Sequence, residues 1–275
     1  MTLDVAIPDA VEADVTYLLD NGQRPANYAY PPPPGVPQRT GVPDVRRVQI
    51  RNARRLPGPP ALDTHGFERH AQPTAVTDFS SEDQIRTVYY REAEAIIRQA
   101  TGAEKVVVFD HTLRSSAQDR GEAVREPVRY VHNDQTFVSG PRRVRDHLPA
   151  DEAEARLRGR FAIINLWRPI GSAVESWPLA VLDGRTLAAE DLVPSDLIYR
   201  DKVGETYSII HRARHRWFYF PRLQPDELVL LKIYDSRTDG TVRLSAHTAF
   251  EDPTSRPDAP VRRSIELRTL VFYPA

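Results

Sequence analysis

The sequence of 275 residues contains no cysteine, which excludes disulfide bonds, zinc sites built on thiolates and cysteine nucleophiles. It also lacks an excess of either charge, because 37 basic and 38 acidic side chains nearly cancel. A chain so balanced has no overall field to attract nucleic acid or an anionic membrane. No apolar run approaches the roughly 18 residues of a membrane span, and residues 1–4 do not begin a secretion signal. We therefore expect a cytoplasmic protein without nucleic-acid or membrane partners.

The first 75 residues are rich in proline and arginine. The prolines within residues 31–34 and 57–60 interrupt regular secondary structure, yet Tyr17, Tyr28 and Ile50 supply apolar anchors at intervals. We predict that residues 1–75 form an extended arm packed on a core domain of residues 76–275. An arm of this kind is also able to exchange between two copies, so a homodimer is one expectation.

One helix and a series of strands are predicted after this arm. Ser81 begins a capping-box pattern, apolar residues then recur at helical spacing, and Gly102 is a C-cap. A short helix is expected at residues 151–160. Short β-branched or aromatic runs bounded by Pro, Gly and Asp predict strands at 106–109, 161–167, 179–182, 207–210, 217–220, 228–234 and 265–272. With strands at 128–132 and 242–247 this makes about nine, enough for a mainly β barrel or jelly roll with flanking helices.

Three side chains form a candidate metal site. His132 and Asp134 are two residues apart, so in a strand they point to the same side. His247 ends another alternating run, from which a neighbouring strand is expected to deliver it. Two imidazoles and one carboxylate are the ligands of non-heme Fe(II) sites that keep coordination positions open for cosubstrate and O2.

A row of polar side chains follows the second histidine. Arg262, Ser264, Glu266 and Arg268 share one face of the predicted strand, whereas Arg263 lies on the other face. An inward charged row beside a metal strand is costly unless it meets a ligand. The planar fork of arginine suits the far carboxylate of 2-oxoglutarate. We expect Arg262 with Ser264 to bind this carboxylate, with a solvent-facing strand edge as the alternative.

Ordered blocks of sequence lie between Tyr89 and Tyr273, at residues 109–114, 131–135, 165–170, 177–180, 204–207, 215–221, 235–236 and 247–253. Together they resemble the CmcJ/AsaB-type hydroxylase and desaturase family, which includes a component of cephamycin hydroxylation and many natural-product enzymes. The resemblance implies a double-stranded β-helix fold of cupin-like type with Fe(II), 2-oxoglutarate and O2, and a metal triad of His132, Asp134 and His247. The family's closing block implies Arg262 as the cosubstrate arginine, although Arg263 beside it leaves the choice open.

Other residues of these blocks are candidates for ligand binding. We expect Asn165, Tyr130 and Arg268 to contact the cosubstrate. A packed core role is the alternative for Tyr130, and it is the preferred one for Trp167. The candidates for substrate contact are Arg168, Trp167, His215 and Trp217.

These features predict an Fe(II)- and 2-oxoglutarate-dependent dioxygenase that hydroxylates, desaturates or oxidatively cyclises a small natural product or amino-acid derivative. The alternative is a non-catalytic subunit of a two-protein biosynthetic enzyme that binds a small molecule or supports its partner. An intact triad favours the enzyme, because a scaffold does not need three convergent ligands. The sequence does not identify the substrate or the type of oxidation.

Overall fold

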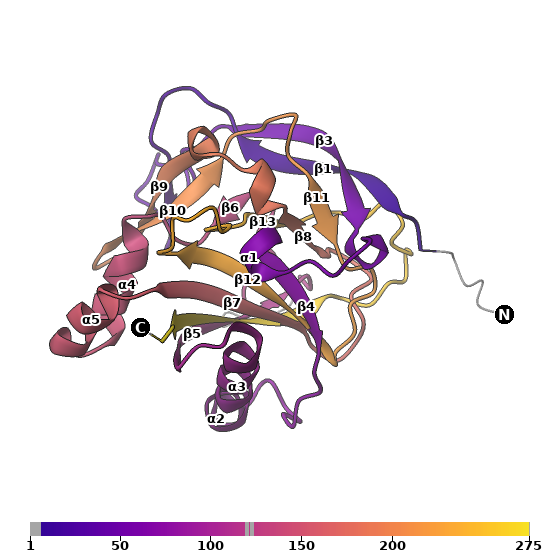
Figure 1. Cartoon of the computed structure of the whole chain (residues 1–275). Helices are drawn as coiled ribbons and strands as arrows, with labels where there is room; N and C mark the ends of the chain where they lie inside the picture. Colours follow the sequence, from indigo (N-terminus) through magenta and orange to yellow (C-terminus); the bar gives the residue numbers. More distant parts are fainter. Residues whose placement is uncertain (1–6, 119–120, 122–123, 275) are drawn as a thin grey trace.

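Two facing β-sheets form the body of the protein, as seen in the computed structural model, which describes residues 7–118, 121 and 124–274 (Figure 1). In spatial order, the nine-stranded sheet consists of β1 (Ala10–Leu18), β3 (Pro43–Asn52), β11 (Trp217–Tyr219), β8 (Leu179–Leu182), β13 (His247–Ala249), β6 (His132–Asn133), β10 (Val203–Ile209), β9 (Leu192–Ile198) and β2 (Ala26–Tyr28). The five-stranded sheet consists of β4 (Phe67–Ala71), β12 (Glu227–Asp235), β7 (Phe161–Pro169), β14 (Arg263–Phe272) and β5 (Lys105–Ser115). This architecture confirms the predicted double-stranded β-helix.

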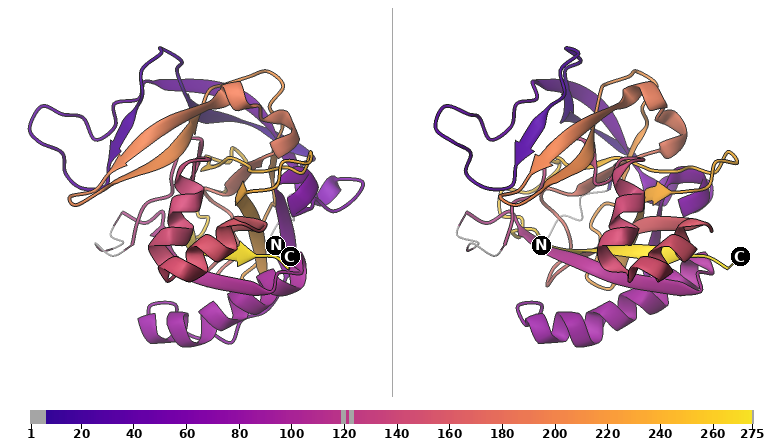
Figure 2. Two further views of the ribbon diagram at one scale, coloured as in Figure 1. Left: turned by 60° about the vertical axis from the view of Figure 1, so that its left-hand side comes forward. Right: turned by 90° about the vertical axis from the view of Figure 1, so that its left-hand side faces the viewer.

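Helices cover the outer face and one end of the five-stranded sheet (Figures 1 and 2). Ile97 and the buried Tyr89 pack against β-strand residues such as Leu166 in one apolar layer. The helical segments are α1 (Leu62–His65), α2 (Glu82–Gln84), the π-helical turn η2 (Ile85–Tyr89), α3 (Tyr90–Thr101), α4 (Ser139–His147) and α5 (Ala150–Leu157), with 3-10 turns η1 (Ala53–Arg55), η3 (Gly184–Thr186) and η4 (Ala189–Asp191). Within the described residues, none of these helices is long and apolar enough to cross a membrane.

The helix predicted between Ser81 and Gly102 is confirmed. The Ser81 hydroxyl accepts a hydrogen bond from the Gln84 amide, as a capping box requires. Gly102 ends the helix in the left-handed region at a φ of +70°, which a residue without Cβ adopts at little cost. α5 confirms the predicted short helix, whereas α4 was not predicted.

The central strand β7 is buried along its whole length. One of its faces meets the apolar layer under α3, and the other face points between the two sheets, where Trp167 joins the inner core. A strand covered on both faces loses the alternation of apolar and polar residues, which explains the continuous run at residues 161–167. This inner space also holds the candidate site.

Two of the predicted strands are wrong in their extent. The expected strand at 128–132 is reduced to β6, preceded only by an isolated bridge between Tyr130 and Thr16. The expected strand at 242–247 begins only at His247. The segment before His247 is bonded to three different partners, so no ladder forms. The Val242 amide bonds to the Asp63 carbonyl in α1, the Ser245 amide to β12 and the Ala246 carbonyl to β8.

The N-terminal segment supplies three strands of the larger sheet. β1 pairs with β3 along nine residues, and β3 pairs in parallel with β11. β2 pairs in parallel with β9 at the far edge of the same sheet. The division into an arm of residues 1–75 and a domain of residues 76–275 stays a prediction.

Candidate metal centre

Two short neighbouring strands inside the nine-stranded sheet carry the histidines of the candidate site. β6 pairs antiparallel with β13, and His132 lies directly opposite His247. Asp134 follows β6 and shares the side of His132, whereas Asn133 between them donates to the Ile233 carbonyl on the other side. Three side chains from distant parts of the sequence therefore converge.

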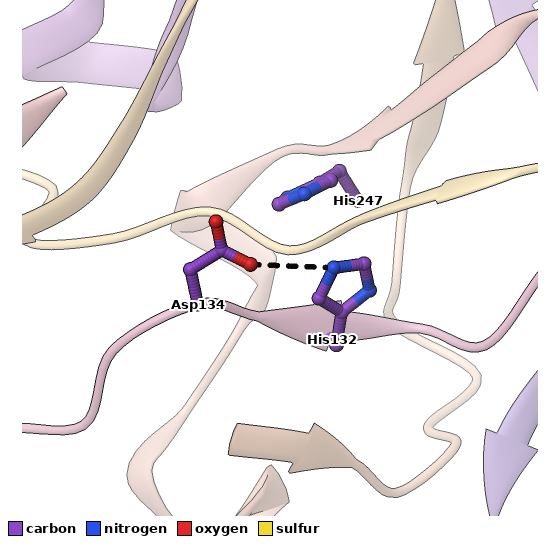
Figure 3. Close-up of side chains that lie close together, drawn as sticks. All are labelled: His132, Asp134 and His247. Carbon is purple, nitrogen blue, oxygen red and sulfur yellow. Dashed lines mark ion pairs between the residues drawn. The ribbon is translucent and has the colours of Figure 1, made fainter. Parts of the chain in front are cut away.

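The three side chains have the spacing of a metal site (Figure 3). One potential ligand atom from each of His132, Asp134 and His247 lies within 4.8 Å of the other two. His132 Nε2 is 3.4 Å from Asp134 Oδ1, and the two imidazole rings are 4.4 Å apart with their planes inclined at 53°. In the described part of the chain, no other group of His, Asp or Glu side chains meets this spacing. Two imidazoles and one carboxylate fit a non-heme Fe(II) ion.

A hydrogen bond orients one histidine, and burial keeps the other neutral. His132 Nδ1 donates to the Tyr130 carbonyl at 2.8 Å, which directs Nε2 toward Asp134. Burial, together with the nearby His132, lowers the pKa of His247 to about 4. A neutral imidazole is the form that binds metal, so His247 fits this role at neutral pH.

One oxygen of Asp134 is anchored while the other faces the histidines. Asp134 Oδ2 accepts hydrogen bonds from Asn165 Nδ2 and Arg268 Nε, each at 2.9 Å. Burial alone raises the pKa of the Asp134 carboxyl, but Arg268 and the contact with His132 outweigh it and hold that pKa well below its usual range. The carboxylate is therefore ionised and oriented before any metal binds.

Glu266 is a second buried carboxylate beside the triad, and sequence reasoning gave it no role. Its Oε1 accepts from Asn165 Nδ2 at 2.9 Å and lies 3.8 Å from His247 Nε2. Its Oε2 lies 3.6 Å from Arg268 and 3.9 Å from Arg114. Burial raises the pKa of Glu266, but Arg268 in particular lowers it, and the net shift is downward. We call Asp134, Asn165, Glu266 and Arg268 the inner charge network.

Arg262 differs from Arg268 because it has no carboxylate partner among the residues that the structure describes. It is buried, and its guanidinium donates to the Trp177 carbonyl at 2.8 Å and lies 3.3 Å from the Ser264 hydroxyl. Its Nε has no hydrogen-bond partner, and among the described residues no carboxylate lies within 4.0 Å of it. Burial and the like charge of Arg114 lower its pKa to about 9. Such a site fits a carboxylate ligand, whereas Arg263 next to it is exposed.

Several predicted contact residues lie away from the metal side chains. Arg168 points to the helical side of the sheet, where its guanidinium donates to the Tyr89 hydroxyl and to the carbonyls of Gln72 and Pro225. Each of its three nitrogens donates there, away from the metal side chains, and a role of Arg168 in substrate binding stays a prediction. Trp167 packs in the core, with the Arg262 guanidinium 5.4 Å from its ring.

His215 and Trp217 lie behind Tyr17. His215 Nε2 is 3.1 Å from the buried Asp191 carboxylate, and the Tyr17 hydroxyl accepts from Trp217 Nε1 at 2.7 Å. Tyr17 lines the cleft next to the metal site, whereas neither His215 nor Trp217 does. These two predicted substrate contacts therefore support a cleft residue from behind.

An open cleft of about 1550 Å³ is lined by His132, Asp134 and Arg268. β5 forms one side of it with residues 109–114, and the N-terminal segment contributes to its lining as well. We call the N-terminal lining residues Asn27, Tyr28, Gln38, Arg39 and Gly41 the N-terminal wall. A double-stranded β-helix with a His-Asp-His cluster, two of whose members line an open cleft, is the arrangement of a small-molecule oxygenase.

Comparisons with known proteins agree with this class. The sequence matches the family described as Oxidoreductase/YMDC permease-like domain over residues 15–272. It is 33% identical to the Fe(II)/2-oxoglutarate-dependent dioxygenase nvfI of Aspergillus novofumigatus, over 89% of this chain and 90% of that protein. It is 45% identical to aspirochlorine biosynthesis protein N of Aspergillus oryzae, over half of this chain and 59% of that protein. A solved structure of the iron and alpha-ketoglutarate-dependent endoperoxidase NvfI superposes with a TM-score of 0.88 at 29% identity, covering 97% of this chain and 99% of that one.

The chain belongs to this oxidoreductase family, whose relatives named hydroxylase/desaturase support the predicted CmcJ/AsaB type.

Proposed function

We propose that this protein is an Fe(II)- and 2-oxoglutarate-dependent dioxygenase of natural-product biosynthesis that holds its iron on His132, Asp134 and His247. The observation that carries the proposal is the convergence of these three side chains, with one ligand atom from each within 4.8 Å of the other two. The names of its relatives support the same cofactor pair.

Arg262 and Ser264 would hold the far carboxylate of 2-oxoglutarate. Arg262 is a buried cation without a carboxylate partner among the described residues, and its Nε still lacks an acceptor. An incoming carboxylate would provide both the missing charge and the missing acceptor. Arg268 is not free for this task, because Asp134, Glu266 and Asp110 surround it. Asn165, a predicted cosubstrate contact, likewise uses its amide donor on Asp134 and Glu266.

The iron and 2-oxoglutarate, once bound, would supply the oxidation of a substrate C–H bond, with O2 consumed and succinate and CO2 released. The chain's own residues would bind the iron and 2-oxoglutarate and orient the metal ligands. The Tyr130 carbonyl fixes the ring of His132, while Asn165 and Arg268 fix Asp134. Such outer hydrogen bonds set ligand direction and basicity.

Several finer predictions remain part of this proposal. The product type is hydroxylation, desaturation or oxidative cyclisation. A cytoplasmic location, and association as a homodimer or with a biosynthetic partner protein, stay predictions from composition and from the N-terminal segment.

The proposal is tested by measuring bound iron and succinate release from 2-oxoglutarate with Fe(II) and ascorbate. We expect the wild-type protein to bind one iron per chain and His132→Ala to lose both iron and succinate formation. His70→Ala is the matched control, because His70 contacts Glu68 on β4, outside the cleft. A wild-type protein that binds no iron and makes no succinate with any candidate substrate would contradict the proposal and favour the non-catalytic subunit.

A further inference from the structure

The N-terminal wall brings the start of the chain to the same cleft as the metal side chains. β2 runs along β9, and the chain then returns beside β2, where the Tyr28 amide bonds to the Gln38 carbonyl and the Thr40 amide to the Ala26 carbonyl, each at 3.0 Å. Figure 2 shows this segment in indigo, projecting beside the strands of the larger sheet. Its residues Asn27, Tyr28 and Arg39 line the cleft together with His132.

Arg39 is held in a defined position on this wall. Its guanidinium donates to Asn27 Oδ1 at 3.2 Å and lies 4.5 Å from the centre of the Tyr130 ring. The carbonyl of the same Tyr130 accepts the hydrogen bond that orients His132. The cation on this ring therefore lies next to the segment that carries His132 and Asp134.

The charge of Arg39 has no carboxylate partner among the described residues, unlike the charges of Arg143 and Arg268 in the same cleft. Arg268 pairs with Asp134, and Arg143 lies 3.2 Å from Asp146. Among the described residues no carboxylate lies within 4.0 Å of Arg39. Arg39 is exposed to solvent in the open cleft, but partial burial by the walls of the cleft lowers its pKa. A partly dehydrated cation of this kind gains from an anionic ligand.

We propose that Arg39 binds a carboxylate of the small-molecule substrate and so directs its carbon skeleton toward the metal side chains. The inference rests on the proposed function and adds a substrate class, a carboxylic acid. A monoanion fits better than a phosphate ester, because Arg39 offers one guanidinium while acidic residues such as Glu82 and Asp110 also line the cleft. Asn27 and Tyr130 act as positioning residues for this arginine.

The test uses the iron-loaded protein with saturating 2-oxoglutarate and without O2, so that Arg262 is occupied and no turnover occurs. The probes are N-acetyl-L-phenylalanine and its uncharged amide, with binding measured by titration calorimetry. A charge-assisted hydrogen bond predicts that the wild-type protein binds the acid roughly tenfold to a hundredfold more tightly than the amide. Arg39→Gln should remove this preference, and Arg39→Lys should keep part of it.

Arg47→Gln is the matched control, since Arg47 is an exposed arginine on β3 that does not line the cleft. It should keep the full preference. Equal binding of acid and amide by the wild-type protein, or an intact preference in Arg39→Gln, would overturn the proposal. Thermal unfolding and 2-oxoglutarate affinity, both expected to be unchanged in Arg39→Gln, show whether the variant is folded. Failure of the proposed function is seen separately, as absent iron and succinate in the wild-type protein.

Discussion

The two sides of the cleft differ in whether their charged side chains are paired. In the inner charge network each carboxylate is paired, since Asp134 and Glu266 share Asn165 and Arg268 as partners. On the N-terminal wall Arg39 has an amide oxygen and an aromatic ring as neighbours, but no carboxylate among the described residues. Paired buried charges fix a geometry, whereas an unpaired charge in an open cleft is available to a ligand. We therefore expect the inner charge network to orient the metal ligands and the N-terminal wall to recognise the substrate.

The largest effect is expected when a cation is removed from the inner charge network. Arg268→Gln would leave Asp134 and Glu266 close together without their main counter-charge. Breaking a buried ion pair from one side costs about 3–5 kcal/mol, so we expect a loss of that order in the free energy of unfolding of the metal-free protein. Urea denaturation measures it, and iron binding should weaken as well. Arg268→Lys should recover part of the stability. A stability loss below about 1 kcal/mol in Arg268→Gln would show that Arg268 does not compensate the negative charges of Asp134 and Glu266.

A smaller effect, with the opposite sign for stability, is expected at Arg262. Arg262→Met removes a buried cation that lacks a counter-ion, so the metal-free protein should be unchanged or more stable. The same change should weaken 2-oxoglutarate binding by about 2–3 kcal/mol, or roughly 30- to 150-fold, because a charge-assisted contact is lost. Equilibrium titration of 2-oxoglutarate with the iron-loaded protein measures this affinity.

Arg263→Met is the control for the neighbouring arginine. Arg263 is exposed, so both stability and 2-oxoglutarate affinity should stay at the wild-type level. If Arg262→Met destabilised the protein as strongly as Arg268→Gln, the distinction between the paired and unpaired arginines would fail.

Strand alternation made much of this site predictable from sequence. The two-residue spacing of His132 and Asp134 placed them on one side, and the row from Arg262 to Arg268 was expected to share a face. The structure agrees on both points, since Arg262, Ser264 and Glu266 are buried while Arg263 is exposed. Alternation depends only on local backbone geometry, so it can be predicted from the sequence before the fold is known.

Contacts between distant segments were not predictable in the same way. Asn165 and Arg168 lie on opposite faces of β7, but the sequence did not reveal that Tyr89 and the carbonyls of Gln72 and Pro225 would accept from Arg168. The role of Glu266 depends on its distances to Arg114 and Arg268, which sequence separation does not report. Arg39 was not singled out from the sequence, because the proline-rich segment was predicted only to pack on the core and nothing local indicates that it returns to the cleft.

The smallest effect is expected at His215, which lies between Asp191 and Tyr17 behind the N-terminal strands. Burial lowers the pKa of His215, and the opposing effect of Asp191 does not restore it. The unfolded chain, with an ordinary histidine pKa of about 6.5, therefore binds more protons than the folded one as the pH falls below that value. Stability should decrease with falling pH, and His215 contributes at most about 1.4 kcal/mol per pH unit to this slope. Urea denaturation between pH 7 and 5.5 should show a shallower slope for His215→Gln than for the wild-type protein. Equal slopes in the two proteins would mean that His215 takes up protons alike in the folded and unfolded chain, so that burial does not lower its pKa.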